Sequence, residues 1–157
     1  MMGIGNNILM RILSVLITVG TRPNYTGDWS TSLTTISRIN PANASGIIDE
    51  VDVEVGSGGV SGLVIATFRL VSGTTYICKS RIVIGTLSQG VNYLTGLSLS
   101  ITAGDYIGCY YSGGYLRHNN TGTNGTYYVS GNYSNVDDST SYTSYFSYLC
   151  LLGRGFS

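Results

Sequence analysis

The chain has 157 residues, the length of one ordinary domain, and only 10% of them are charged. Its formal net charge is zero, and its eight basic residues form no run along the sequence. Nucleic acids bind clustered Lys and Arg, and anionic membranes bind polybasic patches, so we expect neither partner. Hydrophobic residues make up 43% of the chain, which argues against a disordered protein.

An apolar stretch lies near the N-terminus. Residues 8–16 contain two polar side chains, and the other seven are Ile8, Leu9, Met10, Ile12, Leu13, Val15 and Leu16. The stretch is too short for a stable membrane span, which takes about 20 apolar residues. We therefore predict that residues 1–16 are an ordered assembly segment whose apolar side chains pack on another copy of the chain.

Two alternatives for this segment stay open. A cleaved signal peptide would use Arg11 as its basic residue and Ile12–Val19 as its apolar core. A short membrane-associated helix is the other alternative. The spacing of the apolar residues fits a strand as well as one face of a helix, so the conformation is open too.

Beyond Gly20 the sequence alternates between short strand-like runs and turns, with no helical periodicity. Asn40–Gly46 (NPANASG) and Gly56–Gly62 (GSGGVSG) have turn and loop compositions, and Gly113–Asp138 is expected to hold the longest exposed loops. The predicted strands are Leu16–Val19, Leu33–Ile39, Ile48–Val55, Leu63–Val71, Thr74–Ile84, Tyr93–Ile101, Tyr106–Tyr111, Tyr115–His118, Tyr127–Val129 and Tyr142–Leu152.

The clearest strand pattern is that of Ile48–Val55, in which three valines alternate with Asp52 and Glu54. This period of two predicts one buried face and one row of carboxylates that faces solvent. Many short strands of this kind predict an all-β fold: a single-domain antiparallel β-sandwich, jelly-roll-like, over residues 17–157. The apolar N-terminal segment is then a short extension of this domain.

No group of residues has the pattern of a catalytic centre. Asp52 and Glu54 would lie about 7 Å apart on one strand, and the single histidine, His118, has no nucleophile or orienting acid marked beside it. Asp137-Asp138 could contribute to a calcium site, but a plain turn explains this pair better. We expect no catalytic residue, no metal site and no cofactor.

Three cysteines are present, Cys78, Cys109 and Cys150, and each lies in an apolar run. An odd number excludes a fully paired set of intramolecular disulfides. We expect buried free thiols, with one disulfide and one free thiol as the alternative.

Tyrosines are concentrated in the second half of the chain. Neighbouring tyrosines in a strand face opposite sides, so about half of these rings should lie outside the core. Exposed aromatic rings near Asn and Ser suit a subunit interface or a glycan or receptor site, and ordinary strand packing is the third alternative. The candidate binding surface consists of Tyr110, Tyr111, Tyr115, Tyr127, Tyr128 and Tyr133.

Several short motifs resemble a group of uncharacterised β-sandwich proteins from phage and environmental metagenomes. The motifs are Asn40–Gly46 followed by Ile47–Val51, then Phe68–Gly73, Gly96–Leu99 and Gly104–Tyr111, within a region from Val19 to Gly153. The resemblance implies a sandwich fold and a virion or extracellular setting. It implies no enzymatic activity and assigns no functional residue.

These observations together predict a non-enzymatic structural subunit of a virion or extracellular assembly, such as a capsid, fibre or filament. Its partners would be copies of itself. The alternative is a carbohydrate- or receptor-binding adhesion module, for which the tyrosine-rich segment is the candidate surface. An enzyme would require a polar cluster that the sequence does not mark.

Overall fold

The computed structural model describes residues 14–22, 27–29, 32–120 and 124–157. These residues form an all-β protein whose strands pair antiparallel, so the predicted fold class is confirmed at this level. Across these ranges the structure contains no apolar helix with the length of a membrane span. The strands are β1 (Leu16–Thr21), β2 (Gly27–Trp29), β3 (Leu33–Ser37), β4 (Gly46–Ser72), β5 (Thr75–Leu87), β6 (Gly90–Ile101), β7 (Tyr106–Tyr110), β8 (Gly113–Asn119), β9 (Thr126–Ser130), β10 (Ser139–Ser141), β11 (Thr143–Tyr145), β12 (Tyr148–Leu149) and β13 (Leu151–Phe156).

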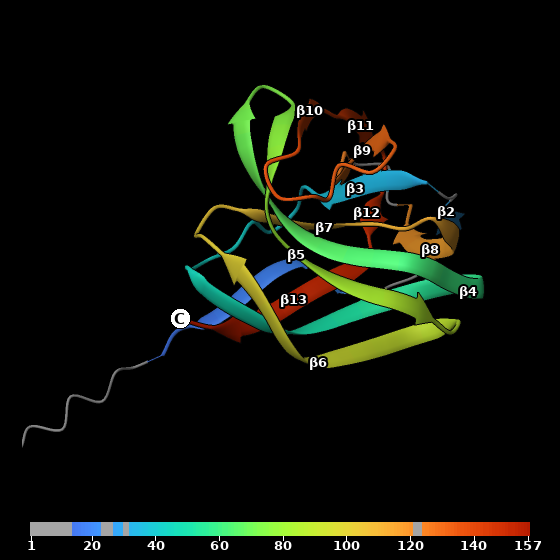
Figure 1. The fold of residues 1–157 in the computed structure, drawn as a ribbon, viewed down its shortest axis with the longest axis horizontal. Coiled ribbons are helices and arrows are strands. Elements are labelled where there is room, and N and C mark those ends of the chain that lie inside the picture. Colours follow the sequence, from blue (N-terminus) through green and yellow to red (C-terminus); the bar gives the residue numbers. More distant parts are fainter. Residues whose placement is uncertain (1–13, 23–26, 30–31, 121–123) are drawn as a thin grey trace, which may run out of the picture.

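The fold is organised around one long hairpin (Figure 1). Its first arm is β4, a strand of 27 residues, and a tight turn at Gly73 and Thr74 reverses the chain. The returning arm consists of β5 and then β6. Since β5 pairs with the second half of β4 and β6 pairs with its first half, β4 connects two groups of strands.

β4 bends in its middle, where the sequence is rich in glycine. Gly58 and Gly59 have φ angles of 82° and 84°, a region of backbone conformation that favours glycine. The register with β5 shifts at the same place, between Val60 and Leu63. The predicted loop at Gly56–Gly62 is therefore wrong, because pairing with β5 and β8 continues the strand through the bend.

The remaining strands extend the two halves of β4. β13 and then β1 lie beside the first half, while β7, β3, β9 and β11 follow one another beside the second half. β8 pairs with β4 at the bend and also with β2 and β12, and β10 pairs with β5. The first and last strands are neighbours, so both ends of the described chain lie together (Figure 1).

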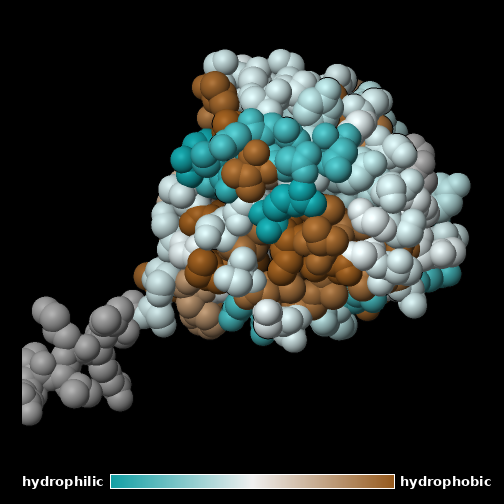
Figure 2. Space-filling view, viewed as in Figure 1, coloured by the Kyte–Doolittle hydropathy of each residue, from teal (hydrophilic) through white to brown (hydrophobic). Residues whose placement is uncertain are grey.

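Two hydrophobic clusters hold these strands together. The larger combines side chains from both halves of β4 with others from β1, β7, β8 and β13, among them Ile17, Val53, Ile65, Ile107, Leu116 and Leu151. The smaller lies on the opposite side of the second half of β4 and contains Ile36, Ala66, Phe68, Tyr76, Cys78, Tyr127 and Tyr142. Apolar surface also reaches the near face of the molecule, where β5 and β6 lie (Figure 2).

Some strand boundaries differ from those predicted. The predicted strand Tyr142–Leu152 is divided among β11, β12 and β13. The predicted strands within Gly113–Asp138 are present as β8 and β9, each slightly longer than expected. The sequence did not predict β2 and β10, because a strand of three residues shows no detectable alternation.

Candidate functional site

The strands β1, β13, β4 and β6 lie side by side and direct alternate side chains away from the core. We call this solvent-facing side, over β1, β13, the first half of β4 and β6, the outer face. The register fixes which residues are neighbours across it. Its two central rows are Thr18–Arg154–Glu50–Thr95 and Gly20–Leu152–Asp52–Tyr93.

One end of the outer face is apolar. Leu16, Phe156 and Ile47 are directly opposed on three neighbouring strands, and they are 52%, 52% and 40% exposed. Contiguous exposed apolar side chains are candidates for a contact surface. This row lies where the N-terminal segment joins β1.

Most of the predicted assembly residues lie outside the described part of the chain. This applies to Ile8, Leu9, Met10, Ile12 and Leu13.

The structure places the remaining two assembly residues, Val15 and Leu16, at the exposed start of the domain. The Val15 amide donates to the Ser157 hydroxyl at 2.9 Å, and Leu16 is the first residue of β1. The first strand therefore begins at Leu16, as the sequence pattern predicted.

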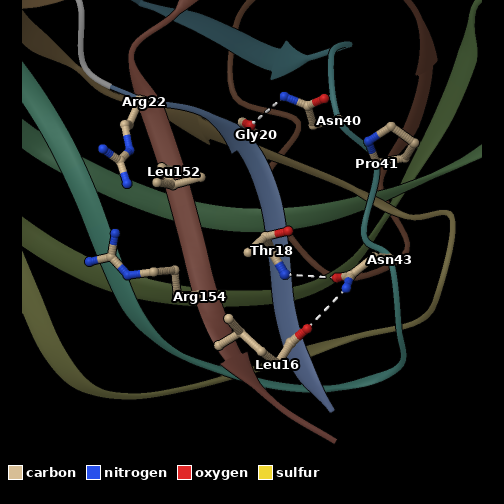
Figure 3. Close-up of a pocket in the computed structure, with 9 residues that line it drawn as sticks. All are labelled: Leu16, Thr18, Gly20, Arg22, Asn40, Pro41, Asn43, Leu152 and Arg154. Carbon is tan, nitrogen blue, oxygen red and sulfur yellow. Dashed lines mark hydrogen bonds between the residues drawn. The ribbon is translucent and has the colours of Figure 1, made fainter.

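The NPANASG segment covers the free edge of β1 (Figure 3). The Asn43 side-chain amide donates to the Leu16 carbonyl at 2.9 Å, and its oxygen accepts from the Thr18 amide at 2.8 Å. Further along, the Gly20 amide donates to the Asn40 carbonyl at 2.9 Å. These bonds satisfy backbone groups that a neighbouring strand would otherwise have paired, so the segment protects this sheet edge.

Two adjoining hollows lie on and beside the outer face. The larger, of about 640 Å³, is bordered by Arg22, Arg154 and the Asn40–Asn43 segment (Figure 3). The smaller, of about 400 Å³, is lined by Arg22, Asp52, Val91, Tyr93 and Arg154. Because Arg22 and Arg154 border both hollows, the two form one shallow groove, and Tyr93, which lines the smaller hollow, is 71% exposed.

Arg154 organises the polar side of this groove. Its Nη1 and Nη2 donate to the two carboxylate oxygens of Asp52, both at 2.7 Å, and its Nε donates to Glu50 at 3.2 Å. These bonds, above all those to Asp52, raise the pKa of the Arg154 guanidinium. The paired charges form a rigid, planar hydrogen-bonding surface beside Tyr93.

The row of carboxylates on β4 does not face solvent as predicted. Asp52 is only 6% exposed and Glu54 is buried as well. The sequence pattern placed these residues on the correct face, but it could not show that basic side chains from β13 and β8 cover them. Arg154 covers Asp52, while Arg117 lies 3.3 Å from Glu54 and 3.4 Å from Asp28.

The six candidate tyrosines do not form one surface. Tyr111 is fully buried in the larger core cluster and Tyr127 is buried in the smaller one, so neither ring can contact a partner. Tyr110, Tyr128 and Tyr133 are half-buried, and Tyr115 is exposed.

The expectation that neighbouring tyrosines face opposite sides agrees with the structure at Tyr127 and Tyr128. Tyr127 packs with Tyr76, and Tyr128 packs with Trp29.

His118 lies in β8 within an aromatic cluster. Its ring is 5.7 Å from that of Trp29 and 6.3 Å from that of Tyr145, measured between centroids. Burial lowers its pKa, so the neutral imidazole is favoured near neutral pH. These ring contacts are consistent with a packing role for His118.

The three cysteines are buried and free of disulfides, as expected. Burial raises the pKa of Cys78 to about 11 and that of Cys109 to about 12. Within the described ranges, no group of three or more His, Cys, Asp or Glu side chains is placed to hold a metal ion. Asp137 and Asp138 lie in a turn, where Asp138 accepts a bond from the Asn135 amide.

The motifs that carry the resemblance have structural roles. Arg69 donates two hydrogen bonds, of 2.8 and 2.9 Å, to the buried carboxylate of Asp105. Asp105 also accepts a backbone bond from Ala42, in the NPANASG segment. Three motifs that are far apart in the sequence thus meet at one place and stabilise it.

Sequence reasoning missed the groove on the outer face. Tyr93 precedes the tyrosine-rich region, and Arg22 and Arg154 are isolated basic residues with no motif around them. Only the strand register brings them together. The alternation within Ile48–Val55 was the one available signal, because it placed Asp52 on the outer face.

Comparison with known proteins gives no match: no family model fits the chain, and no curated protein or solved structure is significantly similar to it.

Proposed function

We propose that this chain is a non-enzymatic structural subunit of a virion or extracellular assembly, and that its partners are copies of itself. The observation that carries the proposal is the exposed row of Leu16, Phe156 and Ile47 at the junction with the apolar N-terminal segment. Removing each such side chain from water is favourable by a free energy of roughly 1.5–3 kcal/mol when the side chain becomes fully buried. Contact with another copy would remove this surface from water.

The domain that supports this role is, in our proposal, a jelly-roll-like β-sandwich. Its two layers would be the strand groups on either half of β4, and both halves contribute side chains to one core cluster. A long hairpin folded across two layers is the arrangement on which jelly rolls are built. Rigid sandwiches with short loops are well suited to repetitive contacts between identical subunits.

The proposal is tested by imaging the purified full-length chain and a variant that lacks Met1–Leu13. This truncation leaves β1 and the bond between Val15 and Ser157 intact. We expect the full chain to form particles or filaments with a regular repeat and the truncated chain to remain a folded monomer. Regular assemblies of the truncated chain, or none from the full chain, would refute the proposal.

A carbohydrate-binding role is the second candidate, and the outer-face groove favours it. Sugars bind where an exposed aromatic ring lies beside planar polar side chains. Tyr93 lies on the strand next to Asp52, and the bidentate pair of Asp52 with Arg154 provides fixed polar atoms. This site replaces the tyrosine-rich segment as the candidate adhesion surface.

A glycan array with the full chain tests this second role. Tyr93→Ala should remove binding, while Tyr115→Ala, which changes an exposed tyrosine on β8, should leave it unchanged. Absence of binding, or equal loss in both variants, would exclude the groove as the site.

A further inference from the structure

The returning arm of the long hairpin has an open edge. One edge of β5 pairs with β4, and its second edge pairs with β10 only as far as Ile77. At the next residue, Cys78, backbone hydrogen bonds join this second edge to residues 137 and 138. Beyond this point the second edges of β5 and β6 have no strand partner among the described residues. The opposite end of the sheet differs, since Asn40 and Asn43 cover the edge of β1.

The sequence along this open edge lacks two common protections against pairing, charged side chains and proline. Residues 82–101 contain no charged side chain and no proline. Charged residues and prolines are two of the devices by which proteins prevent edge-to-edge pairing. An open edge that lacks them is suited to accept a strand.

Apolar side chains lie along the same edge. We call Ile82, Ile84, Leu87, Leu94 and Leu97 the β5–β6 patch. These residues pack against the larger core cluster but are only partly buried. Brown apolar surface is visible on this face of the molecule (Figure 2). An added strand would therefore gain backbone hydrogen bonds and apolar contact together.

We propose that residues 8–13 of a second copy bind as a strand along the open edge of β6 and cover the β5–β6 patch. This inference rests on the proposed function, and it names the surface that the assembly segment occupies.

The length of the segment matches the site. From Gly90 to Thr95, β6 pairs with β4 in continuous register, which gives six residues of regular edge before the register shifts. Residues 8–13 are also six, and five of them are large and apolar. Six residues is a typical strand length.

The position of Arg11 determines which face of the added strand meets the patch. In a strand, Arg11 shares its face with Leu9 and Leu13, so that face belongs on the solvent side. The other face consists of Ile8, Met10 and Ile12, all apolar. This face would continue the inner side of β6, where Leu94 lies opposite the buried Val51.

The strand must come from another copy, because a chain cannot reach its own site. Two hydrogen bonds hold Val15 at Ser157, next to β1: the Val15 amide donates to the Ser157 hydroxyl, and the Ser157 amide donates to the Val15 carbonyl. The order β1, β13, β4, β6 places a strand added beside β6 four strand spacings from β1, about 19 Å. The two residues from Val15 to Leu13 span only about 7 Å.

Cysteine cross-linking in mixed full-length chains tests the proposal. One chain carries Ile8→Cys, Met10→Cys or Ile12→Cys. A second chain carries Leu94→Cys and a tag that gives it a different mass, so that a disulfide between the two chains can be recognised. The native thiols are buried and serve as an unreactive background. Thr95→Cys is the matched control, because Thr95 neighbours Leu94 but lies on the outer face opposite Glu50. Arg11→Cys is the control within the segment.

We expect a mixed disulfide between Leu94→Cys and at least one of the three segment positions. The yield of mixed disulfide should be several-fold lower when Thr95→Cys replaces Leu94→Cys, or when Arg11→Cys replaces the segment cysteine. Equal cross-linking at all positions, or a disulfide within a single chain that carries both changes, would overturn the inference. If the wild-type chain assembles while the Leu94→Cys links fail, the docking surface is wrong and the proposed function stands. If the wild-type chain remains a monomer, both are wrong.

A second variant pair does not depend on cross-linking. Leu94→Lys should raise the concentration needed for assembly roughly tenfold or more, whereas Thr95→Lys should leave it within about twofold. Circular dichroism of both variants establishes that they are folded. Equal effects of the two lysines in folded variants would contradict the proposed surface.

Discussion

The side-chain amide of Asn43 takes the place of a strand beside Leu16. Its Nδ2 donates to the Leu16 carbonyl at 2.9 Å while its Oδ1 accepts from the amide two residues further on. The edge of β1 is thus closed from within the chain, whereas the edge of β6 is open among the described residues. In our proposal, this asymmetry leaves one edge that resists pairing and one that accepts a strand of a second copy.

Replacing Asn43 with Ala should destabilise the domain by about 1 kcal/mol, since two backbone groups of β1 lose their protein partner but remain close to water. Urea denaturation of the chain measures this change. Thr95→Ala, an exposed substitution on β6, is the control and should have little effect. Equal stability of Asn43→Ala and wild type would mean that the amide does not hold the edge.

Arg154→Met should destabilise the domain by about 2–3 kcal/mol, because Asp52 then becomes a buried carboxylate without its bidentate partner. The double variant Arg154→Met with Asp52→Asn should recover part of this loss, since it removes the unpaired charge. A double-mutant cycle from denaturation curves measures the coupling. Strictly additive effects would contradict a direct interaction between the two side chains.

Stability should fall as the pH is lowered from 7 to 5, and His118 should contribute to this fall. Burial lowers the pKa of His118 below its ordinary value of 6.5, so the unfolded chain binds a proton before the folded one does. The stabilisation is present above about 6.5 and is lost as the pH falls towards the lowered pKa of the folded state. His118→Gln should flatten this part of the profile, and an unchanged slope would contradict the assignment.

None of the three cysteines should react with a thiol reagent in the native chain at pH 8. The pKa values of Cys78 and Cys109 are raised to about 11 and about 12, and all three side chains are buried. All three should react at once after unfolding in urea. Mass spectrometry of the labelled chain gives the count, and rapid labelling of a native thiol, or a disulfide, would contradict the structure.

The sequence predicted the all-β class and most strand positions because alternation is a local property. The starts of β1 and β3 and the whole of β7 lie close to their predicted positions. The failure at Gly56–Gly62 has a physical reason: glycines that usually mark a loop here allow a long strand to bend while it stays paired. Pairing with distant segments cannot be inferred from composition.

The candidate site was harder to predict, because it depends on register between segments that are far apart. Asp52 was expected to face solvent, and only its pairing with Arg154, about one hundred residues away, explains why it is buried. Tyr111 and Tyr127 looked like surface residues by composition, yet both fill core positions. Leu16 belongs to the predicted assembly segment, and the structure shows only that its side chain is 52% exposed.

Self-association of the full-length chain is measured by its molar mass in solution, from light scattering at micromolar to high-micromolar concentration. We expect a mass that is a multiple of 16.7 kDa and that increases with concentration, and the mass of a single copy for the chain without Met1–Leu13. A full-length chain that stays at the mass of a single copy over this range would contradict the proposed self-association.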